Sequence, residues 1–123
     1  MTRVTAALAL AMAALPAAAD AAVPANTPGI LVAVPISAYA TTGFTIEQGG
    51  SATFVNLDEV TFVGHDVRSK ATDGSNRPLF TTPVIKTREM AEIEGVSALA
   101  LGSYEYRCSL HSAMTGTLTV TPA

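Results

Sequence analysis

The chain has 123 residues, 49% of them hydrophobic, and a formal charge of −3. This length suits one domain, and the acidic balance argues against nucleic acid as a partner. One cysteine and two histidines exclude an internal disulfide, four-thiolate zinc sites, cysteine-ligated iron–sulfur clusters and multi-histidine catalytic centres.

The chain opens with the pattern of a secretory signal peptide. Arg3 precedes an apolar, alanine-rich stretch at 4–15, Pro16 ends that stretch, and small residues follow. A transmembrane anchor needs roughly 20 apolar residues, so the stretch is too short to be one. We therefore expect residues 1–21 to be a signal peptide that is cleaved after export.

Two prolines at 22–29 predict a flexible leader, and we expect a single folded domain at 30–123. The mature chain should be soluble and exported, most simply to a bacterial periplasm, with no membrane attachment once the signal is removed. An exported domain usually pairs its cysteines or has none. The lone Cys108 therefore needs a reason, and ligating a metal is one.

Short β-rich runs separated by turn signals follow, and none repeats apolar residues at helical spacing. The expected strands lie at 30–36, 44–46, 52–55, 65–70, 91–96, 104–108 and 118–120, with a loop at 73–76. The runs on either side of the Gln48–Gly50 turn should meet as neighbouring strands. About seven short strands predict an all-β, antiparallel Greek-key β-sandwich.

The run at 104–108 alternates, so Tyr104, Tyr106 and Cys108 should share one face of a strand. Because Tyr104 follows Gly102 and Ser103 at the start of this strand, it is either a tyrosine corner or an ordinary core aromatic. In a tyrosine corner the phenol hydroxyl bonds to the backbone of the preceding connection.

Three metal-binding side chains recur at intervals of three residues just after this strand: Cys108, His111 and Met114. We expect a short loop, ending where the last strand begins near Gly116, to gather them around one point. A thiolate and a thioether favour copper, whereas a thioether is a poor ligand for zinc.

The remaining histidine, His65, lies at the start of another expected strand, which a sandwich can bring beside this loop. Taken alone, His65 would be interpreted as a structural histidine and Cys108 as a small buried hydrophobic residue. Met114 alone would be interpreted as part of the core. Together with His111 they match a copper site of two histidines, one cysteine and a weak axial methionine. A cysteine nucleophile with a histidine base is the enzymatic alternative, and it leaves Met114 unexplained.

The sequence resembles the cupredoxins, the family of plastocyanin, amicyanin and pseudoazurin. The resemblance rests on Gly102–Cys108 with His111, Met114 and Gly116–Val120, and on Phe54–Asp58 followed by His65–Val67. It implies one type 1 copper ion with His65, Cys108 and His111 as equatorial ligands and Met114 as the axial ligand. It also implies a buried His65 and a His111 whose ring edge reaches the surface within an apolar patch. Candidates for that patch are Leu110, Ala113, Phe62 and Pro83.

Two departures from the family pattern lie beside the expected ligands. Asp66 stands where the family usually has asparagine, so its ionised side chain can only accept hydrogen bonds, for example from Ser109. Leu110 stands where proline is frequent, so its free N–H could donate a second hydrogen bond to the thiolate. Such a bond should raise the reduction potential, because it weakens electron donation to copper.

Two further departures concern the routes to a partner. Arg107 replaces the aromatic residue that plastocyanins place before the cysteine, which weakens the case for a second electron route. The spacing between Asn56 and His65 is longer than usual, and such a loop could shape docking near the copper.

The function we predict is transfer of single electrons by a Cu(II)/Cu(I) cycle, and the protein should not be an enzyme because no bond is broken. A redox partner protein should dock briefly at the His111 face of a monomer, and the acidic charge favours a basic partner face. A periplasmic copper chaperone or scavenger with the same ligands is the alternative. A metal-free sandwich that serves adhesion or assembly is a third possibility.

Overall fold

The computed structural model describes residues 29–61 and 63–123. The expected signal peptide and all but the last residue of the expected leader lie outside these residues. The first described strand begins at Gly29, one residue before the expected domain start. No helix among the described residues has the length and apolar character needed to span a membrane.

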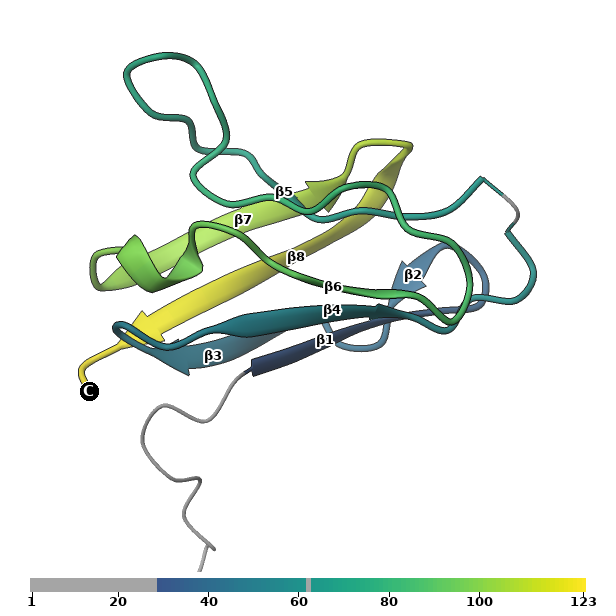
Figure 1. Cartoon of the computed structure of the whole chain (residues 1–123), viewed down its shortest axis with the longest axis horizontal. Coiled ribbons are helices and arrows are strands. Elements are labelled where there is room, and N and C mark those ends of the chain that lie inside the picture. Colours follow the sequence, from purple (N-terminus) through teal and green to yellow (C-terminus); the bar gives the residue numbers. More distant parts are fainter. Residues whose placement is uncertain (1–28, 62) are drawn as a thin grey trace, which may run out of the picture.

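Eight strands form two four-stranded sheets within the described residues (Figure 1). The first sheet has the order β2 (Ala38–Tyr39), β1 (Gly29–Val34), β4 (Ala52–Asn56) and β6 (Met90–Glu92). The second has the order β3 (Gly43–Glu47), β8 (His111–Thr121), β7 (Gly102–Cys108) and β5 (Arg68–Ser69). A 3₁₀ turn, η2 (Val96–Ala98), precedes β7. The expected all-β sandwich is confirmed.

The strand pairing is mixed rather than wholly antiparallel. β1 pairs with β4 in parallel, and β3 pairs with β8 in parallel. The chain turns at Gln48–Gly50, where the Gly50 N–H donates to the Glu47 carbonyl at 2.9 Å. This turn carries the chain from one sheet to the other, so the expected pairing of its two flanking strands is wrong. Alternating apolar residues mark the inward face of both strands, but they do not reveal which strand lies alongside.

The side chains between the sheets form an aromatic core around Tyr106, which is fully buried. Its ring lies edge-on to Tyr39, Phe44 and Phe80, with centroid distances of 5.2, 5.9 and 6.3 Å. Such edge-to-face contacts add to the stabilisation from apolar burial. Cys108 is buried on the same strand, two residues after Tyr106, so the packed core continues up to the end of β7.

Tyr104 is a tyrosine corner. Its hydroxyl donates to the Ala100 carbonyl at 2.7 Å and ties the start of β7 to the connection before it. The ring also packs edge-on against Phe80, so the residue serves the core as well.

Candidate metal centre

The β7–β8 hairpin carries three of the four expected ligands. β7 ends at Cys108, and β8 begins at His111 after the two residues Ser109 and Leu110. We expected the last strand to begin near Gly116, but the pairing of Cys108 with His111 closes a tight turn and draws His111 and Met114 into β8.

A register shift lies directly below this turn. Arg107 pairs with Thr115, whereas Cys108 pairs with His111, so residues 112–114 have no counterpart on β7. Extra residues in one strand bend it and re-aim its side chains. Met114 lies in this bulge and is buried, 2% exposed.

His65 reaches the hairpin from the segment between β4 and β5. Its N–H donates to the Ile85 carbonyl at 3.0 Å, and its carbonyl accepts from the Ile85 N–H at 2.8 Å. Gly64 has a φ of 84°, and a Cβ there would lie 2.8 Å from the Ile85 oxygen. Only glycine fits this close approach without strain, and the resulting backbone pair places His65 in the interior, 0% exposed.

The three side chains converge. The Cys108 Sγ lies 3.8 Å from the His65 Nδ1 and 3.5 Å from the His111 Nδ1, and one ligand atom from each residue lies within 4.8 Å of the others. Bonds of about 2.0–2.3 Å from a metal to nitrogen and sulfur would hold three trigonal ligand atoms roughly 3.5–4.0 Å apart. The His65–Cys108–His111 group therefore has nearly the dimensions of a three-coordinate metal site.

The backbones of Asp66 and Leu110 influence the ionisation of the Cys108 sulfur. Burial raises the pKa of the Cys108 thiol, and hydrogen bonds from the Asp66 and Leu110 backbones partly offset that rise. The Leu110 N–H thus makes the second hydrogen bond expected from the absence of a proline there. A bound metal cation would remove the thiol proton outright.

Asp66 joins the two segments that carry the ligands. Its Oδ1 accepts from the Ser109 N–H at 2.6 Å and its Oδ2 from the Ser109 hydroxyl at 2.7 Å, as the sequence led us to expect. The Tyr39 hydroxyl donates to the Asp66 carbonyl at 2.7 Å, a contact that the sequence did not suggest. Together these bonds fix His65 and Cys108 relative to each other.

Asp58 is a site residue that sequence reasoning missed. Its Oδ2 lies 2.8 Å from the His65 Nε2, and both side chains are fully buried. Burial opposes ionisation, but hydrogen bonds from His65, Ser37 and Val60 outweigh it and hold the pKa of Asp58 well below its usual range. The only signal in the sequence was the unusually long segment between Asn56 and His65.

No protein-family model matches the sequence, and no curated protein matches it. Solved structures do match the fold. A reduced Cu(I) form of an amicyanin variant is 22% identical, with a TM-score of 0.60 over 79% of this chain and 85% of that one. Another reduced amicyanin variant is 21% identical, with a TM-score of 0.61 over the same shares. A purple cupredoxin from Nitrosopumilus maritimus is 24% identical, with a TM-score of 0.56 over 76% of this chain and 99% of that one.

The chain has a cupredoxin fold. The cupredoxin-like fold that the sequence motifs predicted is thus confirmed by the similarity to these solved structures. The three side chains that converge at the end of the sandwich are the ones those motifs singled out.

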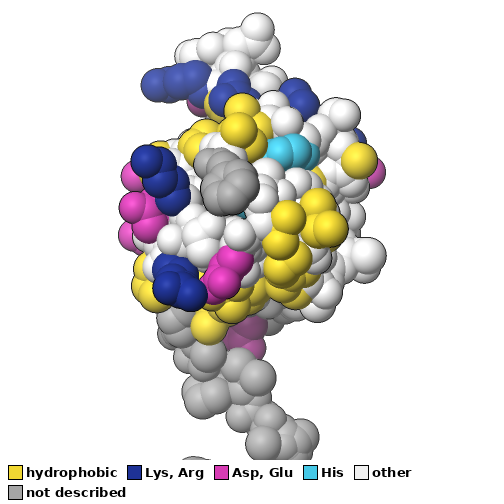
Figure 2. All heavy atoms as spheres, turned by 90° about the vertical axis from the view of Figure 1, so that its right-hand side faces the viewer, with side chains coloured by type: hydrophobic (Ala, Val, Ile, Leu, Met, Phe, Trp, Pro, Cys, Tyr) yellow, Lys and Arg dark blue, Asp and Glu magenta, His cyan; other side chains and the backbone are white. Residues whose placement is uncertain are grey.

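The surface of the protein is apolar around His111. The His111 ring is partly exposed, and a histidine appears at the surface near clusters of hydrophobic side chains in Figure 2. Of the expected patch residues, Leu110, Ala113 and Pro83 are exposed, and Phe62 lies outside the described residues. Val63 and Val84 are also exposed, at 61% and 47%. Val63 lies two residues before His65, and Val84 precedes Ile85, the backbone partner of His65.

Proposed function

We propose that this protein is an exported blue copper protein that carries single electrons between redox partners. The observation that carries the proposal is the triangle of the Cys108 sulfur and the Nδ1 atoms of His65 and His111. In the proposal these three residues would hold one copper ion, and Met114, buried in the bulge of β8, would add a weak sulfur ligand.

The ligand set suits both oxidation states, because thiolate and thioether favour Cu(I) while imidazole binds Cu(I) and Cu(II). The bound ion would supply one-electron exchange. The chain holds the ligands in place before metal arrives: His65 through Ile85, and Cys108 through its pairing with His111. Little movement is then needed when the charge of the site changes, which keeps the barrier to electron transfer low.

Full burial of His65 and Cys108 keeps water and substrates away from the site. His111 is the one member of the triangle that is partly exposed. Electrons would therefore pass through the His111 edge to a partner docked on the patch of Leu110, Val63, Val84, Ala113 and Pro83. We propose a monomer that works in the periplasm and meets its partners in brief encounters of small area, with no substrate bound and no bond broken.

Copper loading tests this function. The purified mature protein is mixed with one equivalent of Cu(II), and its visible absorption and electron-spin-resonance spectra are recorded. We expect an intense blue thiolate-to-copper band, reversible bleaching by a reductant and fast electron self-exchange. Cys108→Ser should abolish the band, while Ser112→Ala, an exposed change in the same hairpin, should leave it intact.

Colourless binding would contradict the carrier. Rapid transfer of Cu(I) to a chelator with slow self-exchange would instead indicate the chaperone or scavenger. Failure to bind copper at all, with the fold intact, would indicate a sandwich with an adhesive or assembly role.

A further inference from the structure

Two buried carboxylates flank the proposed site without belonging to the ligand set. Asp58 is 0% exposed and Asp66 is 5% exposed. Burying a carboxylate is costly unless hydrogen bonds or an opposite charge compensate it. A pair of them at one end of a small domain calls for such compensation.

We propose that Asp58 and Asp66 act as fixed negative charges that favour Cu(II) over Cu(I) and lower the reduction potential of the site. Asp58 acts through the His65 ring, and Asp66 acts beside Cys108. Neither belongs to the His65–Cys108–His111 group, so both are positioning residues that would adjust the potential through the ligands. This inference rests on the proposed function.

The surroundings of Asp58 fit the ionised carboxylate. Its Oδ2 accepts from the Ser37 N–H at 2.9 Å and faces the His65 Nε2 at 2.8 Å. Its Oδ1 accepts from the N–H groups of Val60 and Thr61 at 2.9 and 3.1 Å. Because the His65 Nδ1 faces the sulfur, Nε2 carries the proton and donates to the carboxylate. All four partners are then donors, which suits an acceptor without a proton.

Asp66 likewise meets only donors at its carboxylate, the N–H and the hydroxyl of Ser109. An asparagine could keep two contacts here, because its oxygen can accept from the N–H and its amide can donate to the hydroxyl. The aspartate therefore adds a charge to an arrangement that a neutral side chain could also make.

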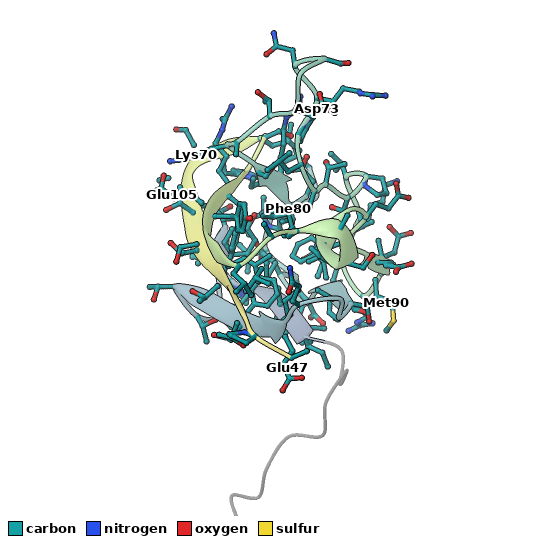
Figure 3. All side chains as sticks on the ribbon, turned by 90° about the vertical axis from the view of Figure 1, so that its left-hand side faces the viewer. Glu47, Lys70, Asp73, Phe80, Met90 and Glu105 are labelled. Carbon is teal, nitrogen blue, oxygen red and sulfur yellow. The ribbon has the colours of Figure 1, made fainter. Side chains whose placement is uncertain are left out.

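The ion pairs found among residues 29–61 and 63–123 bring no lysine or arginine to either carboxylate. Lys70 pairs with Glu105, Arg77 with Asp73 and Arg88 with Glu59. Figure 3 shows Lys70 beside Glu105 at the edge of the second sheet, and Asp73 at the tip of a projecting loop. A cation in the His65–Cys108–His111 group would compensate these charges, because Asp58 contacts the His65 ring and Asp66 follows His65 in the chain. Electrostatic interactions are strong in a buried setting, so the state with the larger positive charge is favoured.

Voltammetry of the copper-loaded protein tests the inference through Asp66→Asn. We expect the preference for Cu(II) over Cu(I) to fall about tenfold, which raises the potential by about 59 mV. Asp73→Asn removes the same charge from an exposed loop and should change the preference less than twofold. Ser109→Ala keeps the Asp66 charge but removes one donor, so its potential should stay level or fall.

A potential that rises for Asp66→Asn but does not rise for Ser109→Ala distinguishes the effect of charge from that of loop geometry. The inference is wrong if Asp66→Asn shifts the potential no more than Asp73→Asn, or if Ser109→Ala raises it equally. Asp58→Asn places an NH₂ group opposite two other donors, the Ser37 N–H and the His65 Nε2–H. Because this mismatch could destabilise the fold, unfolding of the metal-free variant is measured first. If that variant folds, its potential should also rise. A wild-type protein without the blue band would overturn the proposed function itself, before any variant is compared.

Discussion

The hydrogen bond from the Leu110 N–H to the Cys108 sulfur depends on the residue type at position 110, because proline has no N–H to donate. The bond draws electron density from the thiolate and should raise the reduction potential, against the effect that we infer for Asp58 and Asp66. Residues next to the same sulfur would thus adjust the potential in both directions.

Leu110→Pro removes this donor. We expect the copper-loaded variant to keep its blue band, because the ligands are unchanged, and its potential to fall by up to about 59 mV, a tenfold change in relative affinity. Leu110→Ala keeps the N–H and is the matched control in the same voltammetry. An unchanged or higher potential in the proline variant would argue against the bond.

At the scale of the strands, two buried tyrosines lie side by side but use their hydroxyls differently. Tyr39, in β2, donates to the Asp66 carbonyl at 2.7 Å. The hydroxyl of Tyr106, in β7, finds no partner among the described residues. The Tyr39 hydroxyl therefore connects the first sheet to the segment that carries His65 and Asp66. The Tyr106 hydroxyl is buried without a hydrogen bond to offset the cost of its burial.

Replacing each tyrosine with phenylalanine separates these roles. Tyr39→Phe should lower the free energy of unfolding of the metal-free protein by about 1–3 kcal/mol, because it leaves a buried carbonyl unsatisfied. Tyr106→Phe should leave it unchanged or raise it, because it removes a buried polar group that lacks a partner. Chemical denaturation of the two variants measures the difference, and equal losses would contradict the contrast.

Local sequence patterns predicted where the strands lie better than they predicted which strands pair. The alternation along Tyr104, Tyr106 and Cys108 describes β7 because side-chain direction in a strand is set by its nearest neighbours. The parallel pairing of β3 with β8 depends on segments far apart in the chain, and no local pattern encodes it. The contact of Asp58 with His65 was missed for a similar reason, since it depends on the path of an irregular loop.

At the scale of the whole molecule, the charge is distributed differently from what composition suggests. Nine acidic and six basic residues lie between positions 29 and 123, and two of the acids, Asp58 and Asp66, are buried beside the site. The charges of the remaining acidic and basic side chains nearly cancel. The preference for a basic partner face that the net charge suggested should therefore be weak, and the apolar patch around His111 should dominate docking.

Electron self-exchange at different salt concentrations tests this distribution. We expect the rate to change less than about threefold between low and physiological ionic strength, because exposed charges that nearly cancel leave little repulsion to screen. Line broadening in magnetic resonance spectra of half-reduced protein measures the rate. A change of tenfold or more would show that surface charge governs the encounter.

The most direct test of the account is a crystal structure of the Cu(II)-loaded protein. We predict one copper ion bonded to the Nδ1 atoms of His65 and His111 and to the Cys108 sulfur, with the Met114 sulfur at a longer distance on one side of their plane. Copper bound elsewhere, or bound without Cys108, would contradict it.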